Sequence, residues 1–389
     1  MSDDAAHPMR PTPTGLLPLI CVVTILSGAI STLTMKAAYQ TTVDGRRFSK
    51  PFFMESIVGV AMATSLAFVP CVKRKMTRRT SRLRHFAPLP LLAVSDLIVG
   101  LLDVASVLYA PASIISITNC SILIFSAAST RIVLGTRYDW RQWAGIAIAA
   151  MGVGVVGIAA LLHRAVELTT TSASAPAIGV LLSLGARALQ AVQFAFEERF
   201  LKAQRWSPLL QSGGEGAIEM ALCLAIVLPL ANSLPGSDHG RLEDVAATLT
   251  MLRASPTLCA LVTLSGLSLA ALNPLSMLIG QQHGSVLRVF MDVGRPAIVW
   301  AASLVAYRCS GGAYGEPWQS PRAPIELGGF VTLGVGLALF CSQRAPASGA
   351  PAPPQPGCVT DEAVVMRAAG EERLLSVPSS SAPASPVER

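Results

Sequence analysis

The sequence predicts an all-α membrane protein with ten transmembrane helices arranged as two inverted five-helix repeats. Hydrophobic residues make up 52% of the 389 residues and charged residues only 14%, whereas soluble domains carry about 25% charged residues. Ten apolar stretches of roughly 20 residues fill most of the chain, and each is long enough to cross the ~30 Å hydrocarbon core as a helix. The ten stretches divide into five and five.

Polar or turn-forming segments separate the ten stretches. The first stretch exceeds the roughly 7–15 apolar residues of a cleavable signal peptide, so it is predicted to be a retained helix. Pro111-Ala112 forms a minimal turn between the third and fourth helices. The predicted helices cover residues 16–38, 52–72, 87–110, 113–134, 141–162, 177–201, 209–231, 256–279, 285–307 and 325–342.

The chain is expected to have five parts. The segment between the two halves is rich in Thr, Ser and Ala, and the C-terminal tail is rich in Pro, Ala and Ser; such compositions favour flexible or disordered chain. The parts are a cytoplasmic N-terminus (1–15), a first half (16–162), an inter-half loop (163–176), a second half (177–342) and a disordered cytoplasmic tail (343–389).

An odd number of helices in each half requires the halves to insert with opposite orientations. Gly145 and Gly152 in the fifth stretch have the same spacing as Gly329 and Gly336 in the tenth, although ordinary helix-packing glycine explains this nearly as well. Inverted repeats are typical of secondary transporters, whose substrate site lies between the halves near the middle of the membrane.

The distribution of Lys and Arg predicts that both termini are cytoplasmic. With this orientation 17 basic residues lie on the cytoplasmic side and 8 on the other, and seven of the 17 fall between the second and third helices. Cytoplasmic loops carry such an excess of basic residues.

Charged residues inside the predicted helices indicate a polar interior. A charge at mid-membrane costs at least ~2.5–3.5 kcal/mol, so most of these residues should pair or face water. On the ninth helix, Arg288, Asp292 and Arg295 share one face. The full set is Lys36, Arg131, Arg187, Arg288 and Arg295, with Glu55, Asp96, Asp103, Glu215, Glu219 and Asp292.

Three further helices carry polar groups at helical spacing. Asp96 and Asp103 share a face of the third, and Glu215 and Glu219 are one turn apart on the seventh. The sixth carries a broader polar stripe of Arg187, Gln190, Gln193 and Glu197.

Two interpretations of these charges stand. They are either structural ion pairs between helices or a substrate site in which arginines bind an anionic group and acids pair with them in the empty state. The planar guanidinium donates two hydrogen bonds at once to a carboxylate or phosphate. Two arginines around one acid on the ninth helix leave a surplus positive charge, which favours an anionic substrate. We expect Arg288, Arg295, Lys36, Gln190 and Gln193 to bind substrate, and Asp96, Asp103, Asp292, Arg187 and Glu215 to compensate charge or to couple transport to protons.

Other functional classes find little support. The net charge of +7 lies in loops between apolar stretches, which argues against nucleic-acid binding. The eight cysteines and five histidines show no metal-ligand spacing, so neither a metal nor a cofactor is expected. An intramembrane enzyme is disfavoured because the Gly-x-Gly-Asp pattern of aspartyl proteases does not occur, and the one Tyr-Asp pair, Tyr138-Asp139, lies between two predicted helices rather than inside one.

At these same residues the chain resembles the drug/metabolite transporter superfamily (EamA-like), and within it the nucleotide-sugar-transporter-like solute carriers of the F subfamily. The resemblance runs over about residues 25–342, and its closest members are associated with lysosomal and mitochondrial membranes. It implies two inverted five-helix halves, alternating access around a central cavity and a small-molecule substrate. The matching stretches include Pro51-Phe52-Phe53, Ser95-Asp96, Glu197-Glu198-Arg199-Phe200, Glu215-Gly216, Leu242-Glu243-Asp244, and Arg288, Asp292, Arg295 and Trp300.

The chain departs from this family at the start of the fourth helix. The relatives have Gln-x-x-Arg-Gly there, whereas this chain has Ser116, Ile117, Thr118, Asn119 and Cys120. We expect Asn119 to contact substrate in their place. The main hypothesis is a transporter of a small polar or anionic metabolite. The alternative is a receptor or scaffold of transporter shape that does not transport, which a charged interior argues against.

The expected surroundings are a lipid bilayer in an endomembrane, either lysosome and endosome or Golgi, rather than the plasma membrane. The tail sequence Glu371-Glu372-Arg373-Leu374-Leu375 resembles an acidic dileucine sorting signal, although Gly370 stands where the usual acid would be. The sequence leaves a homodimer open.

Overall fold

The computed structural model describes residues 16–73, 88–109, 115, 118–164, 174–203, 206–236, 238–309, 311 and 317–342. All of them belong to one unit, Met1–Gln343. The basic loop at 74–87, most of the inter-half loop and the tail with its dileucine-like stretch lie outside the described residues.

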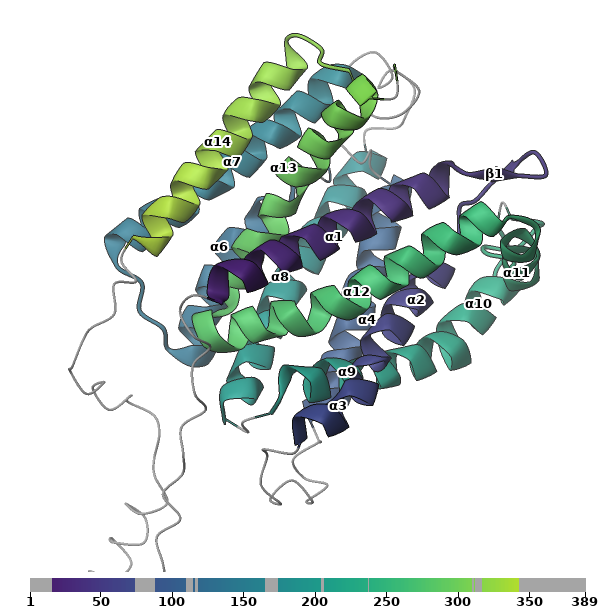
Figure 1. The fold of residues 1–389 in the computed structure, drawn as a ribbon, viewed down its shortest axis with the longest axis horizontal. Helices are drawn as coiled ribbons and strands as arrows, with labels where there is room; N and C mark the ends of the chain where they lie inside the picture. The colour runs from purple at the N-terminus through teal and green to yellow at the C-terminus, as the bar shows by residue number, and fades with distance from the viewer. Residues whose placement is uncertain are drawn as a thin grey trace, which may run out of the picture. The chain divides into compact units, whose positions relative to one another are not determined.

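The described chain is almost entirely helical (Figure 1). The first half contains α1 (Leu17–Gln40), α2 (Pro51–Ala63), α3 (Ser65–Lys73), α4 (Pro88–Tyr109), α6 (Ser121–Leu134) and α7 (Trp140–Arg164). The second half contains α8 (Ser174–Ala203), α9 (Pro208–Leu222), the π-helical η3 (Cys223–Val227), α10 (Leu228–Ser233), α11 (Val245–Ala254), α12 (Pro256–His283), α13 (Ser285–Cys309) and α14 (Arg322–Cys341). A hairpin of β1 (Thr42–Val43) and β2 (Arg46–Arg47) joins α1 to α2.

The predicted all-α membrane fold is confirmed. Within the described ranges, nine helices or helix pairs are long and apolar enough to cross a membrane. The fourth predicted helix is described only from residue 118 onward apart from residue 115, and its helical part, α6, has 14 residues. The complete count of ten therefore stays a prediction.

Apolar side chains on the outside of the helices suit a lipid environment. Leu19, Leu181 and Leu267 are each more than half exposed. Exposed apolar surface of this kind is rare on soluble monomers, whereas lipid tails solvate it.

Corresponding helices of the two halves have corresponding neighbours. The most extensive packing joins α7 to α14, α4 to α8 and α1 to α12, followed equally by α2 to α9 and α6 to α8. When the first to fifth helices are matched in order with the sixth to tenth, α1 corresponds to α8 and α4 to α12. The α1–α12 and α4–α8 contacts then exchange, as two related halves require.

Glycines show that α7 and α14 run antiparallel. A Cβ atom at Gly152 would lie 2.6 Å from the Gly329 carbonyl oxygen, and one at Gly336 would lie 2.6 Å from the Gly145 carbonyl oxygen. The four equally spaced glycines of the sequence are thus two facing pairs in one close crossing, where any side chain would push the helices apart.

The helices α2 and α9 also pack antiparallel. A Cβ at Gly59 would meet the backbone of Met220, and one at Gly216 would meet that of Ala63. The two helices of each pair, α7 with α14 and α2 with α9, are therefore antiparallel, as inverted repeats would require. The inverted repeat itself stays a prediction.

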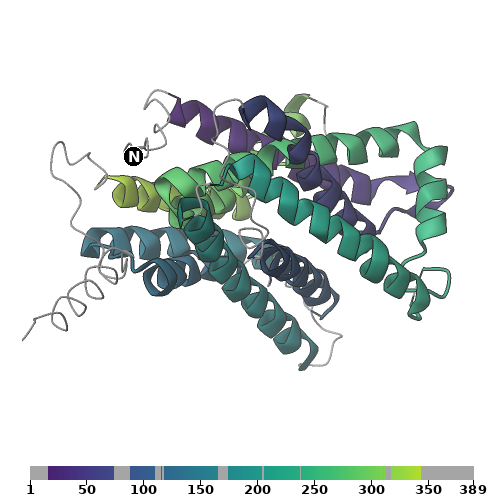
Figure 2. The ribbon, with the colours of Figure 1, turned by 90° about the horizontal axis from the view of Figure 1, so that it is seen from below.

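One end of the molecule carries the hairpin and α11 in both views (Figures 1 and 2). Here Glu243, from the loop before α11, accepts hydrogen bonds from the backbone N–H groups of Phe52 (2.9 Å) and Phe53 (2.8 Å). Lys50 pairs with Asp238 of the same loop. These contacts satisfy the first N–H groups of α2, which have no partner within the helix.

Charge at this loop is set by burial and by nearby donors. Burial raises the pKa of Glu243 above its ordinary value, although the Phe52 and Phe53 N–H groups oppose the rise. Burial also acts to raise the pKa of Asp238, but hydrogen bonds from Lys50 and the Asp244 N–H outweigh it and hold that pKa below its usual range.

Candidate functional site

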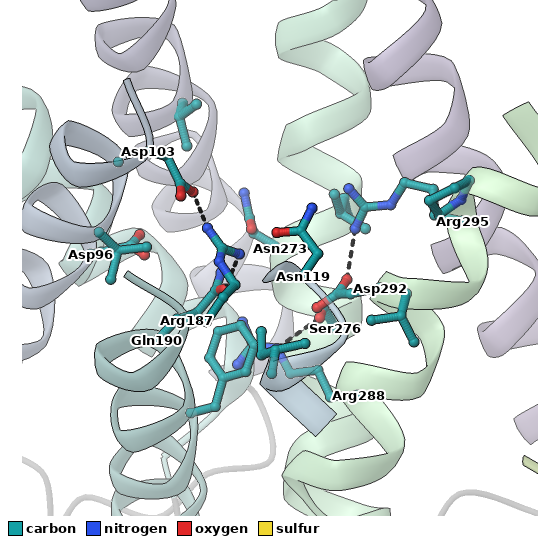
Figure 3. Close-up of a pocket in the computed structure, with 18 of the residues that line it drawn as sticks. Asp96, Asp103, Asn119, Arg187, Gln190, Asn273, Ser276, Arg288, Asp292 and Arg295 are labelled. Carbon is teal, nitrogen blue, oxygen red and sulfur yellow. Dashed lines mark hydrogen bonds and ion pairs between the residues drawn. The ribbon is translucent and has the colours of Figure 1, made fainter. Parts of the chain in front are cut away.

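A cavity of about 530 Å³ lies between helices of the two halves. Figure 3 shows polar side chains from α4, α8, α12 and α13 converging on it. Its charged lining consists of Glu55, Asp96, Asp103, Arg187, Glu197, Arg288, Asp292 and Arg295, and its neutral polar lining includes Asn119, Gln190, Asn273 and Ser276.

Arg187 of α8 joins the two halves across the cavity. Its Nη2 pairs with Asp103 Oδ2 on α4, and its Nη1 donates to Gln190 Oε1 at 2.5 Å (Figure 3). The Arg187 side chain is 12% exposed and that of Asp103 is 40% exposed. This ion pair is therefore within reach of a solute in the cavity.

The Arg288 side chain contacts residues of two neighbouring helices. It pairs with Glu197 of α8, donates from Nε to Ser276 Oγ of α12 at 2.8 Å, and lies over the Phe194 ring with its Cζ 3.8 Å from the ring centroid. Its side chain is 8% exposed. These contacts hold α13 against α8 and α12, close to where α13 begins and the other two helices end.

Gln193 connects this cluster with α4. Its Nε2 donates to Asp96 Oδ1 at 3.0 Å and to Glu197 Oε1 at 2.9 Å. Gln193 is itself buried and does not line the cavity. It orders the two acids rather than facing a solute.

Arg295 lines two cavities. It forms an ion pair of 2.6 Å with Asp292, one turn earlier on α13 (Figure 3). Both residues also line a second cavity of about 440 Å³ beside α1 and α14, where Lys36 and Trp300 lie. A movement of this pair would alter both spaces.

Most of the residues predicted from the sequence meet at the central cavity. Lys36 lines the second of these two cavities, and Gln193 and Glu215 are buried residues that line neither. Whether any of them binds substrate or couples transport stays a prediction. The predicted residues that line the central cavity are Arg288, Arg295, Gln190, Asn119, Asp96, Asp103, Asp292 and Arg187.

No protein-family model matches the chain, but curated proteins do. "Solute carrier family 35 member F6" of Pongo abelii is 25% identical over 347 residues, which cover 84% of this chain and 88% of that protein. The human protein of the same name is 27% identical over 239 residues, 59% of each chain. The chain is related to solute carrier family 35 member F6. The resemblance to the drug/metabolite transporter superfamily is thereby confirmed.

Two other comparisons fit this relationship. An uncharacterized protein of Schizosaccharomyces pombe, C12G12.12, is 24% identical over 225 residues, 57% of this chain and 67% of that protein. A solved crystal structure aligns with a TM-score of 0.57 at 15% identity, over 84% of this chain and 98% of the other. That likeness shows a shared fold.

The charge balance of the central cavity differs from the expectation drawn from the ninth helix. Among the described lining residues there are five acids and three arginines, and each arginine is paired with one acid. Glu55 and Asp96 form no ion pair with any described residue. The surplus in the cavity is thus acidic, because α2, α4 and α8 add acids that one helix could not reveal.

Sequence reasoning did not single out Phe194, Asn273 and Ser276. Asn273 precedes a proline in the eighth predicted helix, which was a usable signal, and it lies on the cavity wall. Phe194 and Ser276 carried no signal, because an aromatic ring and a hydroxyl inside a membrane helix are ordinary. Their roles come from their positions beside the Arg288 guanidinium.

Proposed function

We propose that this protein transports a small polar or anionic metabolite by alternating access between two five-helix halves. One observation carries the proposal: a cavity of about 530 Å³ is lined by charged side chains from both halves. Its volume is within the roughly 300–1,000 Å³ of small-molecule sites. A site between inverted repeats can open to either side as the halves rock about it.

The relationship to a solute carrier supports a transporter rather than an enzyme. The relatives carry the name of a solute carrier, and the described part of this chain has helices long and apolar enough to cross a membrane. A charged interior gives a non-transporting scaffold no benefit and costs it stability. Transport remains the function that uses these groups.

Within this proposal, Arg187 and Arg295 bind the anionic group of the solute. Their partners Asp103 and Asp292 are partly exposed (40% and 26%), so a carboxylate or phosphate can displace them without opening a buried contact. When no solute is bound, Asp103 and Asp292 pair with these arginines in its place. A guanidinium offers such a ligand two parallel hydrogen bonds.

Arg288 is assigned a different part. Because it is buried between α8, α12 and α13, breaking its pair with Glu197 separates the ends of those helices. Glu198, the next residue, accepts from the Ser285 N–H at 2.6 Å and so secures the start of α13. In the predicted orientation this is the cytoplasmic end, and we propose that it parts when the cavity opens to the cytoplasm.

The membrane environment is proposed to be an endomembrane, with both termini cytoplasmic. The excess of basic residues between α3 and α4 supports the orientation, and the dileucine-like tail supports the compartment. Replacing Leu374 and Leu375 with Ala should shift a fluorescently tagged chain toward the plasma membrane. An unchanged distribution would remove the sorting signal from the proposal.

Thermal unfolding of the purified protein in detergent tests the solute site. The panel contains nucleotide sugars, sugar phosphates, amino acids and carboxylates, because a ligand that binds the folded state raises its apparent stability. We expect a shift that disappears in Arg187→Ala and Arg295→Ala. Arg199→Ala is the matched control, because Arg199 is an exposed arginine on α8 that contacts the Val133 carbonyl.

Uptake of the same compound into liposomes then decides between the two functional hypotheses. Uptake that is lost with the two cavity arginines supports transport. Binding without uptake would favour the receptor or scaffold. A thermal shift that survives both cavity substitutions would overturn the assignment of Arg187 and Arg295.

A further inference from the structure

One face of α9 buries three polar side chains in succession. Gln211, Glu215 and Glu219 recur every four residues and are 0%, 0% and 1% exposed. Gln211 Nε2 donates to Glu215 Oε1 at 2.9 Å. The other Glu215 oxygen and both Glu219 oxygens are buried without a hydrogen-bond partner among the described residues.

The surroundings of this face are acidic. Glu55 of α2 and Asp96 of α4 are within electrostatic reach of Glu219, and Glu197 of α8 is within reach of Glu215. The Arg288 guanidinium of α13 is also within electrostatic reach of Glu215, but it already forms an ion pair with Glu197. Among the described residues, the Cys223 thiol is also within electrostatic reach of Glu219 and Glu55, and Tyr39 and Asp103 are within reach of Glu55. Neither α12 before His283 nor α3 before Lys73 carries an Asp, Glu, Lys, Arg or His side chain.

Such carboxyl groups cannot stay ionised without a partner. A buried charge with neither a donor nor a counter-ion is so costly that the group takes up a proton instead. A metal ion is no alternative here, because no group of three or more His, Cys, Asp or Glu residues within the described ranges could hold one. The ligand that fits Glu215 and Glu219 is a proton.

The acidic face of α9 adjoins the cavity through α2. Gly59 packs on the α9 backbone at Met220, where a Cβ would lie 2.8 Å from its nitrogen. Glu55 is one turn before Gly59, lines the cavity, and covers Gly100 of α4 with its carboxyl group. The π-helical segment η3 begins four residues after Glu219, and such segments occur often at functional sites.

We propose that Glu215 and Glu219 bind the proton that couples solute movement to a proton gradient, with Glu55 and Asp96 passing it to and from the cavity. The proposal rests on the proposed transport function. The only reaction is the binding of a proton from cavity water by a carboxylate and its later release. When the Glu197–Arg288 pair opens, the freed guanidinium stabilises the ionised form of Glu215 and so drives release.

Infrared spectroscopy of the full chain in liposomes tests this without any solute. A protonated carboxyl group has a C=O stretching band that a carboxylate lacks. We expect the band in the wild type at neutral pH, and a loss of about half its intensity in Glu219→Gln and in Glu215→Gln. Glu326→Gln is the matched control, because Glu326 is also buried but pairs with Arg322 at 2.8 Å, so the band should remain.

Exchange into D2O separates a coupling site from a sealed structural pair. A proton that is passed to the cavity exchanges with solvent, so the band should shift soon after transfer, and Glu55→Gln should slow the shift. A wild-type protein with no band, a band of undiminished intensity in both α9 variants, or a band that never shifts would overturn the proposal. Testing two α9 variants keeps the result decisive if one fails to fold.

The experiment separates this proposal from the transport proposal. If uptake is found but the band is absent or unaffected, the proton site fails and transport stands. If no panel compound enters liposomes while the band behaves as expected, the proton site stands and its coupling role falls with the transport function.

Discussion

Two pairs of buried glutamates in this protein have opposite surroundings. Glu243 accepts hydrogen bonds from two backbone N–H groups at the start of α2. Glu198 accepts one from the Ser285 N–H at the start of α13 and pairs with Lys202 on its own helix, α8. Glu215 and Glu219 are buried as deeply on α9, yet three of their four oxygens have no partner among the described residues.

The two pairs are equally buried but differ in their hydrogen-bond donors, so burial alone does not assign a role to an acid. Where a helix N-terminus presents free backbone N–H groups, an ionised carboxylate accepts hydrogen bonds from them and complements the positive end of the helix dipole. Where donors are missing, the same side chain is stable only with a proton attached. The first arrangement holds helices in place, and the second can respond to protons.

The largest expected effect comes from turning a partnered acid into an unpartnered one. Arg288→Met removes the cation beside Glu197 while keeping an apolar stem. Breaking a buried pair costs about 3–5 kcal/mol, so thermal unfolding in detergent should show a large loss of stability. The double variant Arg288→Met/Glu197→Gln should recover most of it. A single variant that melts like the wild type would show that Glu197 has no need of Arg288.

A smaller loss is expected at Glu243. Glu243→Gln leaves one acceptor for two N–H groups, and an unsatisfied buried donor costs about 1–3 kcal/mol. Hydrogen exchange at Phe52 and Phe53 should accelerate along with the loss of stability. Asp44→Asn, an exposed acid in the adjacent hairpin, is the control and should change neither. Unaltered exchange in Glu243→Gln would remove its capping role.

The sequence could predict these helices because hydropathy alone decides which segments enter lipid. It could also predict the Arg295–Asp292 pair, whose members share a face of one helix. It could not predict Arg288–Glu197, because the neighbours of a helix depend on packing between distant segments. The same limit left open which cavity Lys36 lines, and it hid the acids that α2, α4 and α8 add to the charges of the ninth helix.

Short elements outside the lipid were also beyond a hydropathy reading. α11 has 10 residues, too few to stand out among long apolar stretches. A local signal was present, since Asp244 accepts from the Ala247 N–H at 3.1 Å as an N-cap, and Asp before an apolar run is typical of a helix start. Glu243 beside it gave no hint of its distant partners on α2.

A still smaller, pH-dependent effect is expected at Asp238, whose carboxylate has donors but is partly exposed. Its pKa is lowered in the folded protein, so its pair with Lys50 contributes stability above the ordinary Asp value of about 3.9 and loses it as pH falls through the lower folded value. Asp238→Asn should therefore lower the melting temperature at neutral pH, but by less than Arg288→Met, because Asp238 is a quarter exposed and water can reach the buried Lys50 ammonium from that side. Melting curves should converge with the wild type in acid; a gap that widens there would contradict this.

The smallest change in stability is expected at the α9 acids themselves. Glu219→Gln replaces a protonated carboxyl group with an amide of the same shape, so the melting temperature should stay close to that of the wild type. Glu197→Gln makes the same chemical change at an equally buried position but strands Arg288, and should cost about 3 kcal/mol or more. Equal losses in the two variants would mean that Glu219 is ionised and has a cationic partner, and the distinction between the two kinds of buried glutamate would fail.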